Sequence, residues 1–214
     1  MFARVTRATI PADKLDQGVA TYQQTILPSL ASQAGFLGGI LLIDRNSGSG
    51  RTISFWNDEA ALRDSDAISA EIRARASRES GAQIREPETY EVVFHERLAP
   101  PRPNVFVRIN EAHGSIEHTD DLVDFGRTQV LQALKAQPGW LAMQLMTNRE
   151  NGRSLIMSVW DSAASREGSD TALRVLREQG AMTMGASSVE VSLYEAVVVQ
   201  VDQAAFPVGE TTPA

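Results

Sequence analysis

Two arginines and two tryptophans are the side chains of this sequence best suited to chemistry, and each pair is separated by 104 residues. Arg4 and Arg108 stand in segments of alternating apolar character, and Trp56 and Trp160 each end such a segment. A guanidinium can stabilise a phenolate or an enolate, and an indole offers a flat wall and one N–H donor to an aromatic ligand. The alternatives are core packing for the tryptophans and internal ion pairs for the arginines.

The residues around Arg108 give the second half of the chain the fuller set of candidate groups. Phe106 and Asn110 share a strand face with Arg108, because alternate residues of a strand point the same way. Asn110 can orient a substrate oxygen, or it can serve turn chemistry at a strand end, and the first half has Thr6 at this position. The predicted catalytic residues are Arg108, Asn110 and Trp160, and the predicted substrate-binding residues are Phe106, Ser158, Trp56 and Arg4.

Each of the other titratable groups allows two interpretations. Glu91 and Glu195 occupy equivalent positions and are the expected ion-pair partners if the arginines are structural. His113 can act as a general base near neutral pH or lie in an exposed loop. Asp66 and Asp170 each follow a Ser, where they can do acid–base work or cap a helix.

The composition excludes several classes of protein. The 214 residues carry 27 acidic and 20 basic side chains, for a net charge of −7, and include no Cys. The acidic balance argues against nucleic acid as a partner, and the lack of an apolar run of ~18 residues argues against a membrane helix. The N-terminus lacks the features of a secretory signal, so we expect a cytoplasmic protein. Without Cys, and without His, Asp and Glu at metal-ligand spacing, we expect no bound metal.

An internal repeat organises the whole chain. A shift of 104 residues aligns Phe2–Val93 with the second half without a gap. Each half has the order strand, helix, β-hairpin, helix, strand, which is the ferredoxin-like β-α-β-β-α-β unit. The predicted segments are strands over 2–9 and 105–112, first helices over 13–34 and 118–137, second helices over 58–79 and 162–180, and closing strands over 89–95 and 189–201. The predicted organisation is a first unit over 1–96, a Pro-rich linker over 97–104, a second unit over 105–201 and a flexible tail over 202–214.

The strands are apolar on both faces, although helices can cover only one of them. We therefore expect an α+β fold in which two ferredoxin-like units pack sheet to sheet as a pseudo-twofold α+β barrel. Such a tandem buries its own sheet face, so the chain can be a monomer with an internal pseudo-dimer or can form a homodimer. The Lys-poor, Ala- and Arg-rich composition is typical of a bacterial source.

Two short motifs recur in both halves. One is a Gly followed by an aromatic residue at the start of the second strand, over 34–37 and 138–141. The other is a third strand that ends in Trp before an acidic, Ala-rich helix, over 54–60 and 158–163. With these motifs the chain resembles the antibiotic biosynthesis monooxygenase type of dimeric α+β barrel, as a tandem duplication. Members of that family include cofactor-free oxygenases that turn anthrone-like or quinol polyketides into quinones, and others that degrade haem.

The resemblance implies a function that the residues can be tested against. A haem-degrading member would need a His in the helix after the third-strand Trp, and neither half has one there, so haem degradation is disfavoured. The expected function is cofactor-independent oxidation of a polycyclic phenol, anthrone or quinol by O₂. In that scheme Trp160 walls the pocket, Arg108 holds the substrate anion and Asn110 orients an oxygen. The alternative is a non-catalytic fused barrel that binds a small hydrophobic ligand or a partner.

Overall fold

The computed structural model describes residues 1–211, which form two compact units. Unit 1 consists of Met1–Thr89, Pro101–Asn104 and Tyr194–Phe206. Unit 2 consists of Tyr90–Pro100, Val105–Leu193 and the described residues from Pro207 onward. None of the helices in residues 1–211 combines the length and the apolar character that a membrane crossing requires.

The two units differ from the two sequence halves because each half contributes its last strand to the other unit. Strand β9 (Val189–Val201) pairs through its C-terminal part with β2 (Phe36–Asp44) in unit 1. Strand β5 (Glu88–Arg97) pairs with β7 (Trp140–Asn148) in unit 2. The boundaries expected at residues 96 and 105 therefore mark the end of the repeat and not the edge of a compact unit.

Part of the predicted flexible tail is packed. Phe206 is only 2% exposed and meets the ring of Phe55 edge to face, with 4.9 Å between the ring centroids. Further on, β10 (Gly209–Thr211) pairs with β5 in unit 2. Phe206 and residues 209–211 of the predicted tail therefore contact other parts of the protein, and the remainder of that tail, 212–214, lies outside the described residues.

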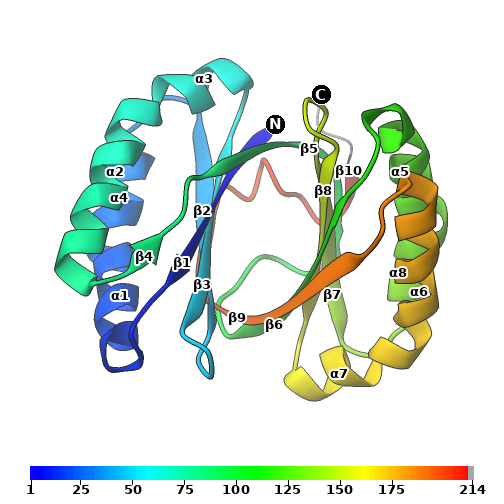
Figure 1. Ribbon diagram of the computed structural model, residues 1–214. Coiled ribbons are helices and arrows are strands. Elements are labelled where there is room, and N and C mark those ends of the chain that lie inside the picture. The colour runs from blue at the N-terminus through cyan, green and yellow to red at the C-terminus, as the bar shows by residue number, and fades with distance from the viewer. Residues whose placement is uncertain (212–214) are drawn as a thin grey trace. The chain divides into compact units, whose positions relative to one another are not determined.

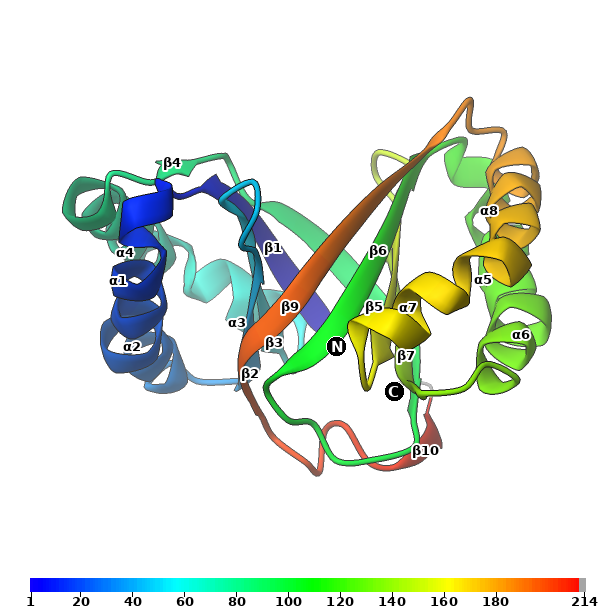
Figure 2. The same ribbon diagram turned by 90° about the horizontal axis from the view of Figure 1, so that it is seen from below.

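Unit 1 is an antiparallel sheet with helices on one face (Figure 1). The strand order is β9-β2-β3-β1-β4. Seen from below, α1, α2 and α4 form one layer (Figure 2). The elements not yet given are β1 (Phe2–Thr9), a 3-10 turn at Ala12–Lys14, α1 (Leu15–Thr21), the π-helical segment η2 (Tyr22–Ile26), α2 (Leu27–Ala31), β3 (Ser49–Trp56), α3 (Glu59–Asp64), α4 (Asp66–Ser80) and β4 (Gln83–Ile84).

Unit 2 repeats this arrangement, with α5, α6 and α8 as its helical layer (Figures 1 and 2). Strand β8 lies between β7 and β6 and is antiparallel to both. The remaining elements are β6 (Val105–His113), a 3-10 turn at Ile116–His118, α5 (Thr119–Phe125), the π-helical segment η4 (Gly126–Val130), α6 (Leu131–Lys135), β8 (Arg153–Trp160), α7 (Ala163–Gly168) and α8 (Asp170–Met184). The α+β class and the two ferredoxin-like units expected from the sequence are confirmed.

The core of each unit lies between its sheet and its helices. In unit 1, Leu27 of α2 packs with Leu41 and Ile43 of β2, all at most 4% exposed. Alternate strand residues reach this layer because side chains alternate across a sheet. In unit 1 the five-residue π-helical segment η2 joins α1 to α2, and in unit 2 the equivalent segment η4 joins α5 to α6. The two segments occupy corresponding positions in the repeat. Such segments often occur at functional sites.

Candidate functional site

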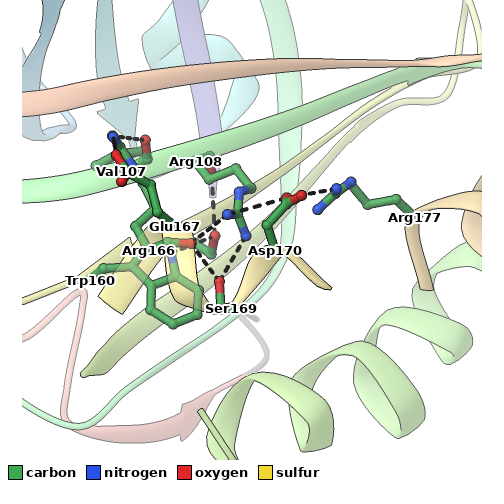
Figure 3. Close-up of polar contacts among 9 residues, drawn as sticks. Val107, Arg108, Trp160, Arg166, Glu167, Ser169, Asp170 and Arg177 are labelled. Atoms are coloured by element: carbon green, nitrogen blue, oxygen red, sulfur yellow. Dashed lines mark hydrogen bonds and ion pairs between the residues drawn. The ribbon is translucent and has the colours of Figure 1, made fainter. Parts of the chain in front are cut away.

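Arg108 ties strand β6 to the junction between α7 and α8 (Figure 3). Its guanidinium donates to Ser169 Oγ at 3.0 Å and to the carbonyl oxygen of Arg166, and it lies 3.4 Å from the Asp170 carboxylate. Arg108 is only 2% exposed. Its two terminal nitrogens are thus committed to protein groups in the described structure.

The indole of Trp160 covers this cluster from the side. The Arg108 guanidinium carbon lies 5.9 Å from the centroid of the Trp160 ring (Figure 3). The Trp160 indole N–H donates to Ser158 Oγ at 3.1 Å, and in unit 1 the Trp56 indole donates to Ser54 at the same distance. Both tryptophans are fully buried. The repeated Trp therefore packs in the core with its N–H already satisfied.

Arg4 makes the corresponding contacts in unit 1. It donates to Ser65 Oγ at 2.9 Å and to Ser69 Oγ at 2.6 Å, and it forms an ion pair with Asp66. Its guanidinium carbon lies 5.7 Å from the Trp56 ring centroid. The same strand-to-helix link thus stands in both units, as expected of a structural element of the repeat.

The electrostatics of the two arginines are set by burial and by the repeated aspartates. Burial lowers the pKa of Arg4 and of Arg108, and the nearby carboxylate of Asp66 or Asp170 acts in the opposite direction. The Asp at the start of α4 and α8 is therefore the counter-ion of a buried guanidinium.

The expectation that Glu91 and Glu195 pair with these arginines is wrong. Glu91 pairs with Arg149 at 3.2 Å, and Glu195 pairs with Arg45 at 3.4 Å. Both carboxylates reach exposed arginines at the ends of hairpin strands, while the helix-borne aspartates are the groups that reach the buried guanidinium groups.

Unit 1 contains a cavity of about 100 Å³ between its sheet and its helices, here called the unit 1 cavity. Its floor is the helix-facing side of β1 and β3, and its roof is formed by α4 and by the run from α1 to α2. Three hydroxyl side chains lie on the floor, where a core sheet usually carries aliphatic groups. They belong to Thr6, Thr52 and Ser54.

Unit 2 has a cavity of only about 50 Å³ at the corresponding place, here called the unit 2 cavity. Larger apolar side chains account for the difference. Phe125, Ile156, Leu173 and Met184 line it where the unit 1 cavity has smaller polar residues. The unit 1 counterparts are Thr21, Thr52, Ser69 and Ser80.

Tyr22 is a polar group of the unit 1 cavity that the repeat does not share, since unit 2 has Gly126 at this position. Tyr22 is 2% exposed, and its hydroxyl has no hydrogen-bond partner among the described residues. Burial raises the pKa of Tyr22 well above its usual value, so the group is a neutral donor at physiological pH. A methyl group at Gly39 would lie 2.6 Å from this hydroxyl, so the glycine gives it access to the sheet.

Arg73 is the second group without a partner in the unit 1 cavity. It projects from α4, one turn after Ser69, and is partly buried. Within the described residues no hydrogen bond or ion pair joins it to a carboxylate. Its charge contributes to the lowered pKa of Arg4, which indicates that the two cations are close. The equivalent Arg177 in unit 2 donates to Asp170 at 2.7 Å (Figure 3).

The sequence is similar along most of its length to two uncharacterized proteins of Mycobacterium tuberculosis. One is 24% identical over 198 residues, which cover 90% of this chain and 88% of the relative. The other is 26% identical over 199 residues, which cover 92% of this chain and 84% of the relative. No family model matches the sequence.

Solved structures with the same fold come from monooxygenase-like proteins. A candidate monooxygenase from Fusobacterium nucleatum superimposes with a TM-score of 0.68 at 14% identity, over 100% of this chain and 98% of that one. An anthrone oxidase-like protein gives a TM-score of 0.67 at 15% identity, with 94% and 93% coverage. A Listeria monocytogenes ferredoxin-fold protein related to antibiotic biosynthesis monooxygenases gives 0.51 at 11% identity, with 92% and 96% coverage. The chain has the fold of these monooxygenase-like proteins.

Within this monooxygenase-like fold, the residues predicted from the sequence fall into two groups. Asn110 and Ser158 line the unit 2 cavity, and Arg4 lines the unit 1 cavity. The other four predicted residues line neither cavity in the described structure. They are Arg108, Phe106, Trp56 and Trp160. Phe106 instead packs against the Arg166 guanidinium, 5.6 Å from its ring centroid.

The remaining sequence candidates do not gather around either cavity. His113 is exposed at the end of β6, as one of its two interpretations expected. In the part of the chain that the structure describes, no group of three or more His, Cys, Asp or Glu side chains is placed to hold a metal ion. Tyr22 and Arg73 were not predicted as site residues from the sequence. Tyr22 could have been found because the equivalent position in the second half is Gly126.

Proposed function

We propose that the protein is a cofactor-independent monooxygenase that oxidises a phenol or a quinol with O₂ in the unit 1 cavity. The carrying observation is that unit 1 keeps open space and hydroxyl groups where unit 2 has bulky apolar side chains. The fold shared with a candidate monooxygenase and with an anthrone oxidase-like protein supports the reaction class. The partners are then one small aromatic molecule and O₂.

The cavity volume favours a single aromatic ring. At about 100 Å³ it is comparable with the cavity of roughly 150 Å³ that admits benzene in a protein core. Sites for drug-sized ligands occupy roughly 300–1,000 Å³. A single-ring phenol or quinol therefore suits the site better than a polycyclic anthrone, which requires the helices to move away from the sheet.

The chemistry requires an electron-rich substrate anion and no metal or flavin. A phenolate gives one electron to O₂, and the resulting superoxide bonds to the ring carbon opposite the phenolate oxygen. The ring hydrogen on that carbon then leaves as a proton while the O–O bond breaks and water departs. One atom of O₂ ends in the para-quinone and the other in water, so phenol plus O₂ gives quinone plus water. A para-quinol has no ring hydrogen at that carbon and instead gives up two electrons and two protons to O₂, which yields quinone plus H₂O₂.

The side chains of the cavity can assist this reaction by binding and desolvation. Tyr22 offers a buried hydroxyl donor, and the floor hydroxyls of Thr6 and Ser54 offer further hydrogen bonds to substrate oxygens. Among the described residues no carboxylate or imidazole lines the cavity. The proton of the substrate must therefore pass to water, which favours substrates that ionise readily.

The cavity has no carboxylate or imidazole among its described residues that could act as a general base. This favours a second candidate function, which is binding of a small aromatic ligand without turnover. The unit 1 cavity serves this function with the same residues, and only the O₂ reaction separates the two. The candidate functions therefore differ in one measurable quantity, the consumption of O₂.

Oxygen uptake by the metal-stripped protein, with phenols and hydroquinones of one and three rings, tests the proposal. We expect protein-dependent uptake matched by quinone. A phenol should carry one atom of ¹⁸O₂ into its quinone, whereas a hydroquinone should give quinone and H₂O₂ with no ¹⁸O in the quinone. Thr52→Ile, which copies Ile156 of unit 2 into the cavity, should abolish the uptake, and Ile156→Val in unit 2 should leave it intact. Uptake no faster than in buffer would reject the monooxygenase, and equilibrium binding of the same compounds would then identify a binding protein.

A further inference from the structure

The unit 1 cavity carries an excess of positive charge. Three arginines line it, and no acidic side chain does so among the described residues. Arg4 has its counter-ion in Asp66, and Arg51 donates to the hydroxyl of Tyr194 at 2.8 Å. Arg73 is partly buried at the cavity, and no carboxylate meets its charge in the described structure. A cation on an apolar cavity wall is stabilised by any anion that enters the cavity.

In unit 2 the arginine equivalent to Arg73 is Arg177, and it shares the carboxylate of Asp170 with Arg108. There Asp170 receives Arg177 at 2.7 Å and Arg108 at 3.4 Å. In unit 1 the equivalent Asp66 pairs with Arg4, and Arg73 remains at the cavity. The comparison is internal to one chain and one fold, and it shows that the same residue type at the same position of the repeat pairs in unit 2 and lies at the cavity in unit 1.

Tyr22 gives the same cavity a second unmatched donor. Its hydroxyl is buried and has no acceptor among the described residues, although buried polar groups are normally paired. Gly39 leaves it room beside the strand that carries Ser54, since Gly39 and Ser54 are paired across β2 and β3. A ligand oxygen that enters the cavity is an acceptor that this hydroxyl lacks.

We propose that the unit 1 cavity binds an aromatic ligand that carries one ionised oxygen, with Arg73 as its counter-ion and Tyr22 as a hydrogen-bond donor. This inference rests on the proposed function in that it concerns the same cavity, and it specifies the substrate class as anionic. A phenolate and a carboxylate share the required chemistry, because each presents an oxygen anion on a flat ring. Arg73 thus favours the ionised form of the ligand, which for a phenol is the form that can reduce O₂.

Equilibrium binding of three single-ring probes to the full chain under argon tests the inference. The probes are 4-nitrophenol, whose ionisation changes its absorbance, benzoate, and the neutral nitrobenzene. We expect the two anions to bind at least about tenfold more tightly than nitrobenzene, and bound 4-nitrophenol to ionise at a lower pH than the free compound. The tighter of the two anions shows whether the cavity prefers a phenolate or a carboxylate.

Variants on the same helix show whether Arg73 is responsible. Arg73→Gln should remove the preference for anions, Arg73→Lys should restore part of it, and Arg78→Gln, at an exposed position of α4, should leave it unchanged. Tyr22→Phe should weaken anion binding by about threefold to tenfold. Equal affinity for nitrobenzene and the anions, a preference that survives in Arg73→Gln, or the absence of binding by all three probes would each overturn the inference.

The binding assay is independent of the oxygen assay. Anion binding that depends on Arg73, without O₂ uptake, would retain the inference and reject the monooxygenase. Uptake that is unchanged in Arg73→Gln would retain the monooxygenase and reject the inference.

Discussion

Arg73 and Arg177 occupy equivalent positions in the two units, but in the described structure only Arg177 meets a carboxylate, Asp170, at 2.7 Å. The repeated Arg, Trp and Asp residues hold strand to helix in both units. Tyr22 and Thr52, which differ from their unit 2 counterparts, line the unit 1 cavity together with Arg73. The repeated Arg, Trp and Asp contacts therefore mark the scaffold, and the candidate site is marked by changed residues and by a repeated arginine whose contacts have changed.

Tyr22→Phe should raise the stability of the ligand-free protein while it weakens ligand binding. A buried hydroxyl without a partner costs about 1–3 kcal/mol, so its removal should increase the free energy of unfolding by about 1 kcal/mol. Chemical denaturation of wild type and variant, without ligand, measures this. A loss of stability would mean that the hydroxyl is bonded in the folded protein. Tyr90→Phe, at another buried tyrosine that does not line the cavity, is the matched control.

The same hydroxyl predicts a loss of stability at alkaline pH. Burial raises the pKa of Tyr22 in the folded protein, so above pH ~10 the unfolded chain releases this proton first. Unfolding then becomes more favourable as pH rises, by up to about 1.4 kcal/mol per pH unit for this one group. Unfolding curves from pH 8 to ~11 should show a smaller decline in Tyr22→Phe than in wild type. Parallel declines would exclude Tyr22 as the cause.

The sequence was sufficient to predict the units but not the exchange of strands. Residues 2–9 form β1, as their short β-branched alternation predicts. The exchange leaves the repeat of 104 residues unchanged, since β5 and β9 have the same sequence pattern whichever sheet they join. The π-helical segments were also not predicted, because no local residue pattern distinguishes them from α-helix.

The candidate site was predicted less well than the fold, and for a physical reason. Similarity between the halves indicated Arg108 and Trp160 as site residues, but both side chains make contacts within the protein core and are not available to a ligand. A cavity depends on differences in side-chain volume, such as Thr21 against Phe125, which the repeat presents only as mismatches. The hypothesis that the second half holds the better site therefore gave weight to Asn110, although the larger cavity lies in unit 1.

Substitution of Arg108 should affect stability more than chemistry. Arg108→Leu removes hydrogen bonds to Ser169 and to the Arg166 carbonyl, and should reduce the free energy of unfolding by about 2 kcal/mol. Asp170 is half exposed and keeps Arg177, so the loss should stay below that of a fully buried ion pair. Denaturation curves and oxygen uptake at a temperature where the variant is folded measure both effects. A folded variant without uptake would instead restore the catalytic role predicted from the sequence.

Gly18 offers the most direct test of the cavity, because it lies in α1 at the position that Leu122 occupies in unit 2. A methyl group at residue 18 would lie 3.4 Å from Ile10 Cδ1, which is close but acceptable contact. Gly18→Ala should therefore stabilise the protein by about 1 kcal/mol through helix propensity, and it should leave space for a single ring. Gly18→Leu should fill the cavity and abolish probe binding and oxygen uptake together, while the protein remains folded. If Gly18→Leu binds the probes as wild type does, the ligand site lies elsewhere in the molecule.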